Sequence, residues 1–103
     1  MHPLSQPARP LIVEDFAPYV GTAFKVDATP TAVDLQLDDI QRHKVTHPGY
    51  REPFTLLFST PMAALLVAGT YRMRTKDGRD IEIDLIPTQI GPGPRRAYHA
   101  VFT

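Results

Sequence analysis

Two alternating runs around an Asp-Gly dipeptide constrain the fold of this chain more than any other part of its sequence. Asp-Gly between alternating apolar runs is typical of a β-hairpin turn. A two-residue loop would place Met73 opposite Glu82 and would mix apolar with charged residues on both faces. A loop of residues 76–78 instead pairs Met73 with Ile81. The sequence therefore predicts the three-residue loop, with Gly78 in the left-handed conformation.

This register also separates the charged residues of the hairpin from its apolar residues. The expected charged neighbours are Arg72 with Glu82 and Arg74 with Asp80. Exposed pairs of this type contribute only about 0–1 kcal/mol of stability each. Their main effect would be to fix the register, so we interpret the hairpin as a structural element.

Four further runs of the chain have the same period of two, which is typical of half-buried strands. These runs are Phe24–Ala28, Val33–Leu37, Phe54–Ser59 and Tyr98–Phe102. Ile40 is out of phase with the second run by one residue, which predicts a β-bulge near Asp38 and Asp39. Six short strands with little helix favour an all-β, mainly antiparallel fold, either a small six-stranded barrel or a two-sheet sandwich.

The remaining segments are expected to be an arm, helical turns and loops. Residues 1–10 read as a flexible Pro-rich arm, and residues 11–103 as a single β domain. Glu14–Tyr19 is expected to form a short helical turn whose Phe16 packs over the core. Pro61–Leu66 would be a second short helix or an extended crossing. The two longest loops are expected at His43–Pro53 and Ile90–Arg96.

Composition excludes several classes of function. The eleven basic and eleven acidic residues cancel, so no whole-chain charge favours a nucleic acid or a membrane partner. Cysteine is absent, which excludes disulfides and thiolate chemistry. The sequence shows neither a secretory signal peptide nor a membrane-length apolar run. We expect a protein that is cytoplasmic or assembled into a particle or fibre.

Candidate catalytic and metal-binding groups are few. His43 and His47 have a spacing that suits a shared metal on a helix, but Pro48 follows at once and the region reads as loop. Carboxylates such as Asp34 fall on outward positions of strands, and a solvated sheet face is a poor setting for acid–base catalysis. We therefore expect no catalytic, cofactor-binding or metal-ligating residues and no cofactor.

Candidate interface residues stand out more clearly. Leu57 and Val101 are apolar side chains on the expected outer faces of their strands. Arg95 and Arg96 follow a Gly-Pro-Gly-Pro segment, where we expect an exposed basic loop. Either Phe54–Ser59 or the C-terminal strand would be an edge that pairs with another chain.

Several segments follow one another in an order typical of a known family. They are E-D-F-x-x-x-x-G-x-x-F from Glu14, P-F-T-L-L-F-S-T-P from Pro53, then A-G-T-Y-R-M, D-L-I-P and Y-H-A-V-F. From about Asp15 onward the chain resembles an uncharacterised bacterial domain family of about one hundred residues, often encoded near proteins with a phage-tail-collar domain. Thr60, Ala68 and Thr103 depart from its usual Gly, Gln and Asn. The resemblance implies a fold but no catalytic residues.

Three functions follow from these observations, in decreasing order of preference. The first is a non-enzymatic structural or protein-interaction domain that self-associates, as an accessory to a phage-tail-like or surface-fibre assembly. The second is a small-ligand-binding β-barrel with the His43–Pro53 loop over its mouth. The third is a metal-dependent enzyme that uses His43 and His47.

Overall fold

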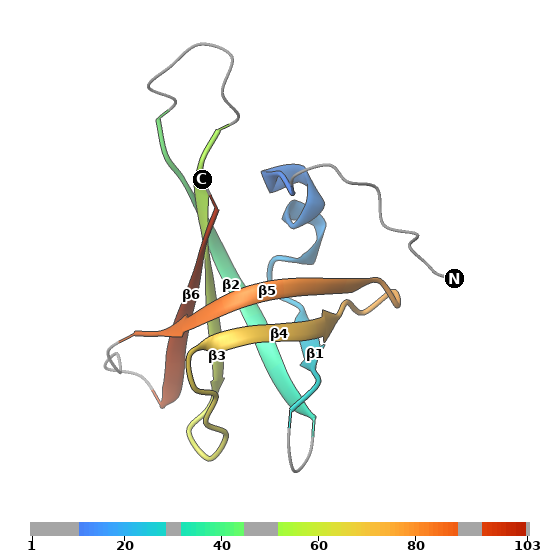
Figure 1. The fold of residues 1–103 in the computed structure, drawn as a ribbon, viewed down its shortest axis with the longest axis vertical. Coiled ribbons are helices and arrows are strands. Elements are labelled where there is room, and N and C mark those ends of the chain that lie inside the picture. Colours follow the sequence, from blue (N-terminus) through green and yellow to red (C-terminus); the bar gives the residue numbers. More distant parts are fainter. Residues whose placement is uncertain (1–10, 29–31, 45–51, 89–93, 103) are drawn as a thin grey trace.

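The computed structural model describes residues 11–28, 32–44, 52–88 and 94–102. Six antiparallel strands close into a barrel in the order β1-β2-β3-β6-β5-β4 (Figure 1). They are β1 (Ala23–Val26), β2 (Val33–Arg42), β3 (Phe54–Pro61), β4 (Gly69–Arg74), β5 (Asp80–Pro87) and β6 (Arg95–Phe102). The all-β prediction is confirmed, and the closed sheet decides for the barrel over the sandwich. The predicted arm at residues 1–10 lies outside the described residues.

Strands β1 and β2 form a meander with β3, and their alternating apolar residues point into the barrel. Phe24, Val26, Leu35 and Leu37 are fully buried. The register of β2 on β3 shifts between Leu37 and Asp39, so the predicted bulge is confirmed. The extra residue returns Ile40 to the inner side, where it packs partly buried against the core.

The longest ladder joins β3 to β6 and corrects one prediction. Eight register pairs run from Phe54 opposite Phe102 to Pro61 opposite Arg95. Because β3 also pairs with β2, and β6 also pairs with β5, the prediction that Phe54–Ser59 or the C-terminal strand is an edge strand is wrong. Alternation within one strand shows which side chains face inward, but not which strands lie beside it.

The β4–β5 hairpin has the predicted register. Met73 lies opposite Ile81, Arg72 opposite Glu82 and Arg74 opposite Asp80. The N–H of Thr75 donates to the carbonyl of Arg79 at 2.8 Å, which closes a loop of residues 76–78. Gly78 has a φ of 93°, the left-handed conformation that this loop requires.

Two short 3₁₀ turns precede the first strand and cover one end of the barrel. They are η1 (Val13–Asp15) and η2 (Ala17–Tyr19). The carboxylate of Asp15 accepts the Ile12 N–H at 2.8 Å, which satisfies a donor at the start of η1. Phe16 is fully buried, with its ring 5.9 Å from that of Phe54 and 5.4 Å from that of Phe102. The predicted helical turn and its aromatic plug are confirmed.

The connection from β3 to β4 contains no helix. A turn at its start is closed by the Ala64 N–H, which donates to the Pro61 carbonyl at 3.0 Å. The chain then crosses to β4 without regular structure. Leu66 anchors this crossing, because its N–H donates to the buried Tyr98 hydroxyl at 3.1 Å. The hydroxyl of Thr60 donates to the Ala64 carbonyl at 3.0 Å.

Aromatic and aliphatic side chains from all six strands fill the interior of the barrel. The largest fully buried side chains are Tyr98, Phe16, Phe24, Phe54, Phe58, Leu35, Leu37, Leu56, Met73, Ile83, Leu85 and Val26. A core occupied in this way gives no support to the alternative of a ligand held inside the barrel mouth. The candidate sites therefore lie on the outer faces of the barrel.

The hairpin joins the rest of the barrel through two short seams. β1 pairs with β4 at two register pairs, and β5 pairs with β6 at two, Ile86 with His99 and Pro87 with Tyr98. Figure 1 shows the reason, because β4 and β5 run across the direction of β3 and β6. No helix within the described ranges is long and apolar enough to cross a membrane.

Candidate functional site

The outer surface of β3 and β6 brings together three of the four residues predicted for an interface. Leu57 lies opposite His99 in the β3–β6 register, and Val101 lies two residues further along β6. Arg95 shares their outward phase at the start of the same strand. Alternation places Arg96 on the inner side, where its Nε donates to the Met62 carbonyl at 2.8 Å.

Four side chains form what we call the β3–β6 face: Leu57, Ile86, His99 and Val101. His99 is the centre of this surface, because it has Leu57 as its register partner on one side and Ile86 on the other. Ile86 is 45% exposed and Val101 54% exposed. The β3–β6 face therefore presents largely apolar side chains to solvent, as interfaces between proteins do.

Polar groups close to this surface are already satisfied within the chain. The Nε2 of His43 lies 2.9 Å from the Thr55 hydroxyl, so the imidazole covers this outward but buried residue of β3. At the other end, the Nε of Arg95 donates to the Ser59 hydroxyl at 2.8 Å, and its terminal nitrogen donates to the Ser59 carbonyl at 3.1 Å. The hydrogen bonds hold Arg95 against β3 at the border of the β3–β6 face.

The location predicted for the two arginines is wrong. Arg95 and Arg96 are the first residues of β6, opposite Pro61 and Thr60 of β3, and do not belong to a Pro-Gly loop. Pairing with β3 makes β6 begin before its alternating apolar run. The sequence of β6 alone does not indicate this extension. Of the predicted loop Ile90–Arg96, residues 90–93 lie outside the described residues, and Pro94 forms a bend before the strand.

Ile86 and His99 were not singled out by the sequence. Both fall on outward positions of their strands, so the period of two marks them as surface residues. Their contact depends on β5 lying beside β6, which follows only from closure of the barrel. A search for outward apolar residues on every strand would have found Ile86.

The third alternative, a metal site at His43 and His47, gains no support from the described part of the chain. His43 is exposed and its ring contacts Thr55. His47 lies outside the described residues. Within the described ranges, no group of three or more His, Cys, Asp or Glu side chains could hold a metal ion.

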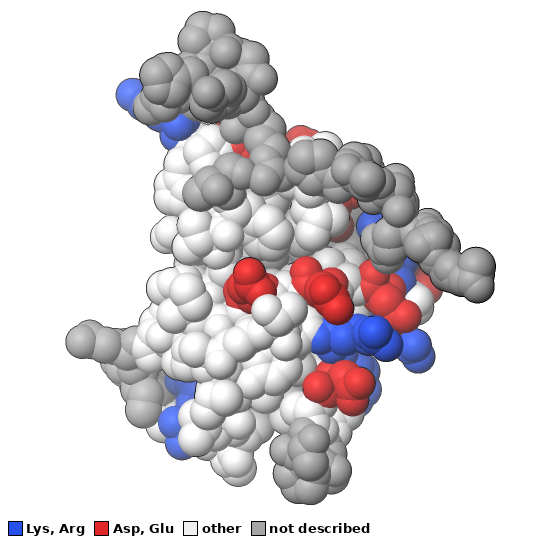
Figure 2. Space-filling model, viewed as in Figure 1, with Lys and Arg blue, Asp and Glu red and all other residues white. Residues whose placement is uncertain are grey.

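The outer surface of the hairpin is charged, in contrast to the β3–β6 face. Its outward residues form what we call the charged face: Arg72, Arg74, Asp80, Glu82 and Asp84. Figure 2 shows acidic and basic side chains side by side over the hairpin. Arg74 donates to Asp80 at 3.0 Å, and this bond holds the pKa of the Asp80 carboxyl below its usual value. These carboxylates lie on an exposed face, and Asp80 is ion-paired with Arg74, which does not suit acid–base catalysis.

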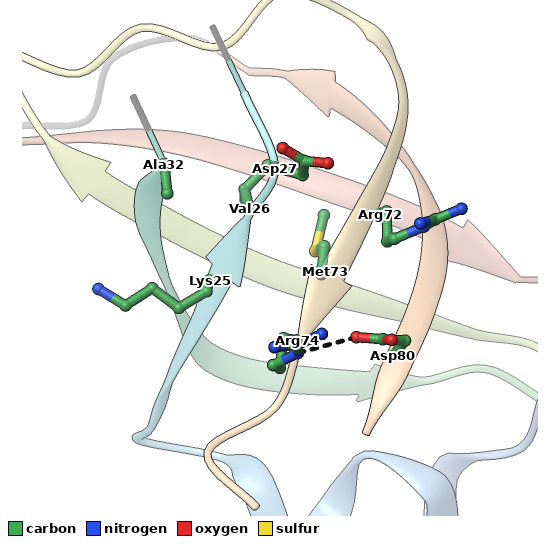
Figure 3. A pocket seen from close by; sticks show the side chains of 8 residues that line it. All are labelled: Lys25, Val26, Asp27, Ala32, Arg72, Met73, Arg74 and Asp80. Carbon is green, nitrogen blue, oxygen red and sulfur yellow. Dashed lines mark hydrogen bonds and ion pairs between the residues drawn. The ribbon is translucent and has the colours of Figure 1, made fainter. Parts of the chain in front are cut away.

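A shallow pocket of about 340 Å³ lies where β1 meets β4 (Figure 3). Val26 and Met73 are among its lining residues, and both are fully buried. Lys25 and Arg72 point away from one another in Figure 3. Lys25 already forms an ion pair with Asp34 at 2.6 Å. Because the charged groups do not converge on one point, the pocket offers no built site for a small ligand.

The closed six-stranded barrel, with its filled core and its exposed outer faces, defines a small all-β domain whose candidate sites are surfaces. The chain belongs to the family described as Domain of unknown function (DUF6916), whose model matches residues 11–102. This match agrees with the resemblance to an uncharacterised domain family of about one hundred residues. No curated protein and no solved structure matches the chain significantly.

Proposed function

We propose that this domain is a non-enzymatic protein-interaction module that self-associates through the β3–β6 face. The observation that carries the proposal is the group of three apolar outward side chains around His99. A symmetric dimer buries the same patch of both copies, so an apolar patch is complementary to itself. The balanced charge of the chain adds no net repulsion between two copies.

The chemistry of the rest of the surface agrees with a role in binding. The barrel core is filled by its own side chains, and the described carboxylates of the charged face lie on the outside. The resemblance to a family encoded near phage-tail-collar proteins suggests the setting. There, the domain would be an accessory of a phage-tail-like or surface-fibre assembly, in which repeated contacts between copies are useful.

The test is a concentration series by sedimentation equilibrium or light scattering. The native chain should show an average mass that rises with concentration, whereas Val101→Asp should raise the dissociation constant by about tenfold or more, or abolish the rise. Val101 is 54% exposed, so the substitution should not unfold the barrel.

Leu65→Asp provides a matched control. Leu65 is 63% exposed in the β3–β4 connection and lines a hollow with β1 and β2 residues such as Lys25 and Asp34. Leu65→Asp adds the same negative charge as Val101→Asp but away from the β3–β6 face, so it should leave self-association unchanged. A native chain that remains monomeric up to about 1 mM, or an equal effect of both variants, would show that the proposal is wrong.

A further inference from the structure

The β6 side of β5 carries an unfinished ladder. β5 pairs with β4 over six residues but with β6 only at Ile86 and Pro87. Among the described residues, no strand lies against the β6 side of Glu82 and Asp84. The ladder stops because β5 runs across β6, so the two strands separate beyond their two register pairs (Figure 1).

The hydrogen-bond pattern of the hairpin shows which main-chain groups face this opening. The Thr75–Arg79 bond at 2.8 Å marks one bonded pair, and antiparallel strands alternate bonded with non-bonded pairs. Glu82 and Asp84 are therefore in non-bonded positions, and direct their N–H and C=O groups away from β4. Thr88 has the same phase, and its N–H donates across the seam to the Ala97 carbonyl at 3.0 Å. We call the main-chain groups of Glu82 and Asp84 the β5 edge.

The side chains beside the β5 edge set the chemistry of any strand added there. Ile81, Ile83 and Leu85 point inward and are buried, while Glu82 and Asp84 point outward and are exposed. On the β4 side, Arg72 is the register partner of Glu82, but the partner of Asp84 is the neutral Thr70. The charged face has three acidic side chains and two arginines, Asp80, Glu82 and Asp84 against Arg72 and Arg74, so it keeps an acidic surplus.

We propose that the β5 edge binds an extended segment of a partner protein in which basic and apolar residues alternate. Main-chain hydrogen bonds to the β5 edge would supply affinity, as in other complexes that add a strand to a sheet. Basic side chains of the segment would lie beside Glu82 and Asp84, since neighbours across a ladder share a face. Its apolar side chains would lie on the side of Ile83.

A second copy of this chain does not fit the same edge. Two antiparallel copies of β5 that met at Glu82 would place Glu82 opposite Glu82 and Asp84 opposite Asp80. Like charges directly opposite one another destabilise a strand pair. The acidic row therefore blocks edge-to-edge pairing of copies while it admits a basic strand. This site differs from the β3–β6 face, so the two proposals stand or fall separately.

The probe is a blocked peptide of about seven residues with alternating Val and Lys, a length that matches a typical strand. Its binding is followed by NMR shifts and by hydrogen exchange of the main-chain amides. Shifts should centre on β5, and exchange of the Glu82 and Asp84 amides should slow, because both N–H groups acquire acceptors. The counterpart with Glu in place of Lys should bind at least about tenfold more weakly.

Charge reversal gives the decisive comparison. The double variant Glu82→Lys, Asp84→Lys should lose about tenfold or more in affinity for the Val-Lys peptide and should gain binding of the Val-Glu peptide. Asp38→Lys, Asp39→Lys is the matched control, because it changes the net charge equally at two exposed β2 residues. It should leave both affinities within about twofold.

Several results would overturn the proposal. These are undetectable binding of the Val-Lys peptide at about 2 mM, shifts centred away from β5, equal affinity for the two peptides, or equal losses in the two double variants. Binding confined to the β5 edge in a chain that stays monomeric would support this proposal and refute self-association. A chain that self-associates through the β3–β6 face but does not bind the Val-Lys peptide would support self-association and refute this proposal.

Discussion

The β3–β6 pair and the β4–β5 pair use the same alternation but present opposite outer surfaces. Both pairs direct buried apolar side chains into one core. At the outward positions, β3 and β6 carry residues such as Leu57 and Val101 and a single arginine, Arg95 at the start of β6, whereas β4 and β5 carry the charged face. The inward-facing side chains therefore determine the fold, and the outward-facing side chains are free to determine the binding partner.

The two pairs also differ in how they are held in the barrel. β3 has long ladders on both sides, with β2 and with β6. The hairpin has only two-residue seams with β1 and β6, and its turn is fastened by the Tyr19 hydroxyl, which donates to the Asp77 carboxylate at 2.9 Å. Long ladders give β3 no free edge, while the short seams leave the β5 edge without a ladder partner among the described residues.

The largest expected effect separates inner from outer positions on a single strand. Phe58 is 1% exposed, and Phe58→Ala should lower the free energy of unfolding by about 3–5 kcal/mol because it leaves a cavity in the core. Leu57, the residue directly before it, is half-buried and points outward, so Leu57→Ala should lower the free energy of unfolding by clearly less. Urea denaturation of both variants measures this difference. Equal losses would contradict the assignment of inner and outer faces.

An intermediate effect is expected where a buried hydroxyl anchors β6. Tyr98→Phe should cost about 1–3 kcal/mol, because it removes the acceptor of the Leu66 N–H from a buried site. Tyr71→Phe is the matched control on β4, where the hydroxyl donates to the exposed Val67 carbonyl at 2.8 Å. Denaturation should show a smaller loss for this control. A reversed order would mean that the Tyr98 contact does not stabilise the crossing.

The smallest effect concerns the turn of the hairpin and its dependence on pH. Hydrogen bonds from Thr75 and Tyr19 lower the pKa of the Asp77 carboxyl in the folded chain. A lowered folded pKa contributes stability that is present above the unfolded value, about 3.9, and is lost as the pH falls through the folded pKa. Asp77→Asn should therefore reduce the loss of stability on acidification.

Denaturation at pH 7 and at pH 3 measures this dependence. Tyr19→Phe keeps the buried ring but removes one of the two donors to Asp77, so its acid dependence should fall between the native chain and Asp77→Asn. If Asp77→Asn retained the full acid dependence of the native chain, the hydrogen bonds at the turn would not be its source.

Local features of this fold could be read from the sequence. The hairpin register, the left-handed Gly78, the bulge after Leu37 and the aromatic plug of Phe16 were all predicted correctly. Each depends on residues close in the chain, where backbone conformation, alternation and charge pairing act together. The candidate site was predicted in part, because outward phase alone identified Leu57 and Val101.

The positions of strands relative to one another could not be read in the same way. Neither the place of β3 between β2 and β6 nor the strand conformation of Arg95 and Arg96 was predicted. Which distant segments pair depends on how all six strands pack together around one shared core. No single alternating run contains that information.

For this protein, the sequence by itself determined that short strands alternate around an apolar core and how the hairpin turns. The tertiary structure decided that the sheet closes, that Ile86 lies beside His99, and that the β5 edge lacks a ladder partner among the described residues. The physical reason is the distance along the chain over which each effect acts. Alternation and turn chemistry depend on a few consecutive residues, whereas the order of the strands depends on burial of the whole core.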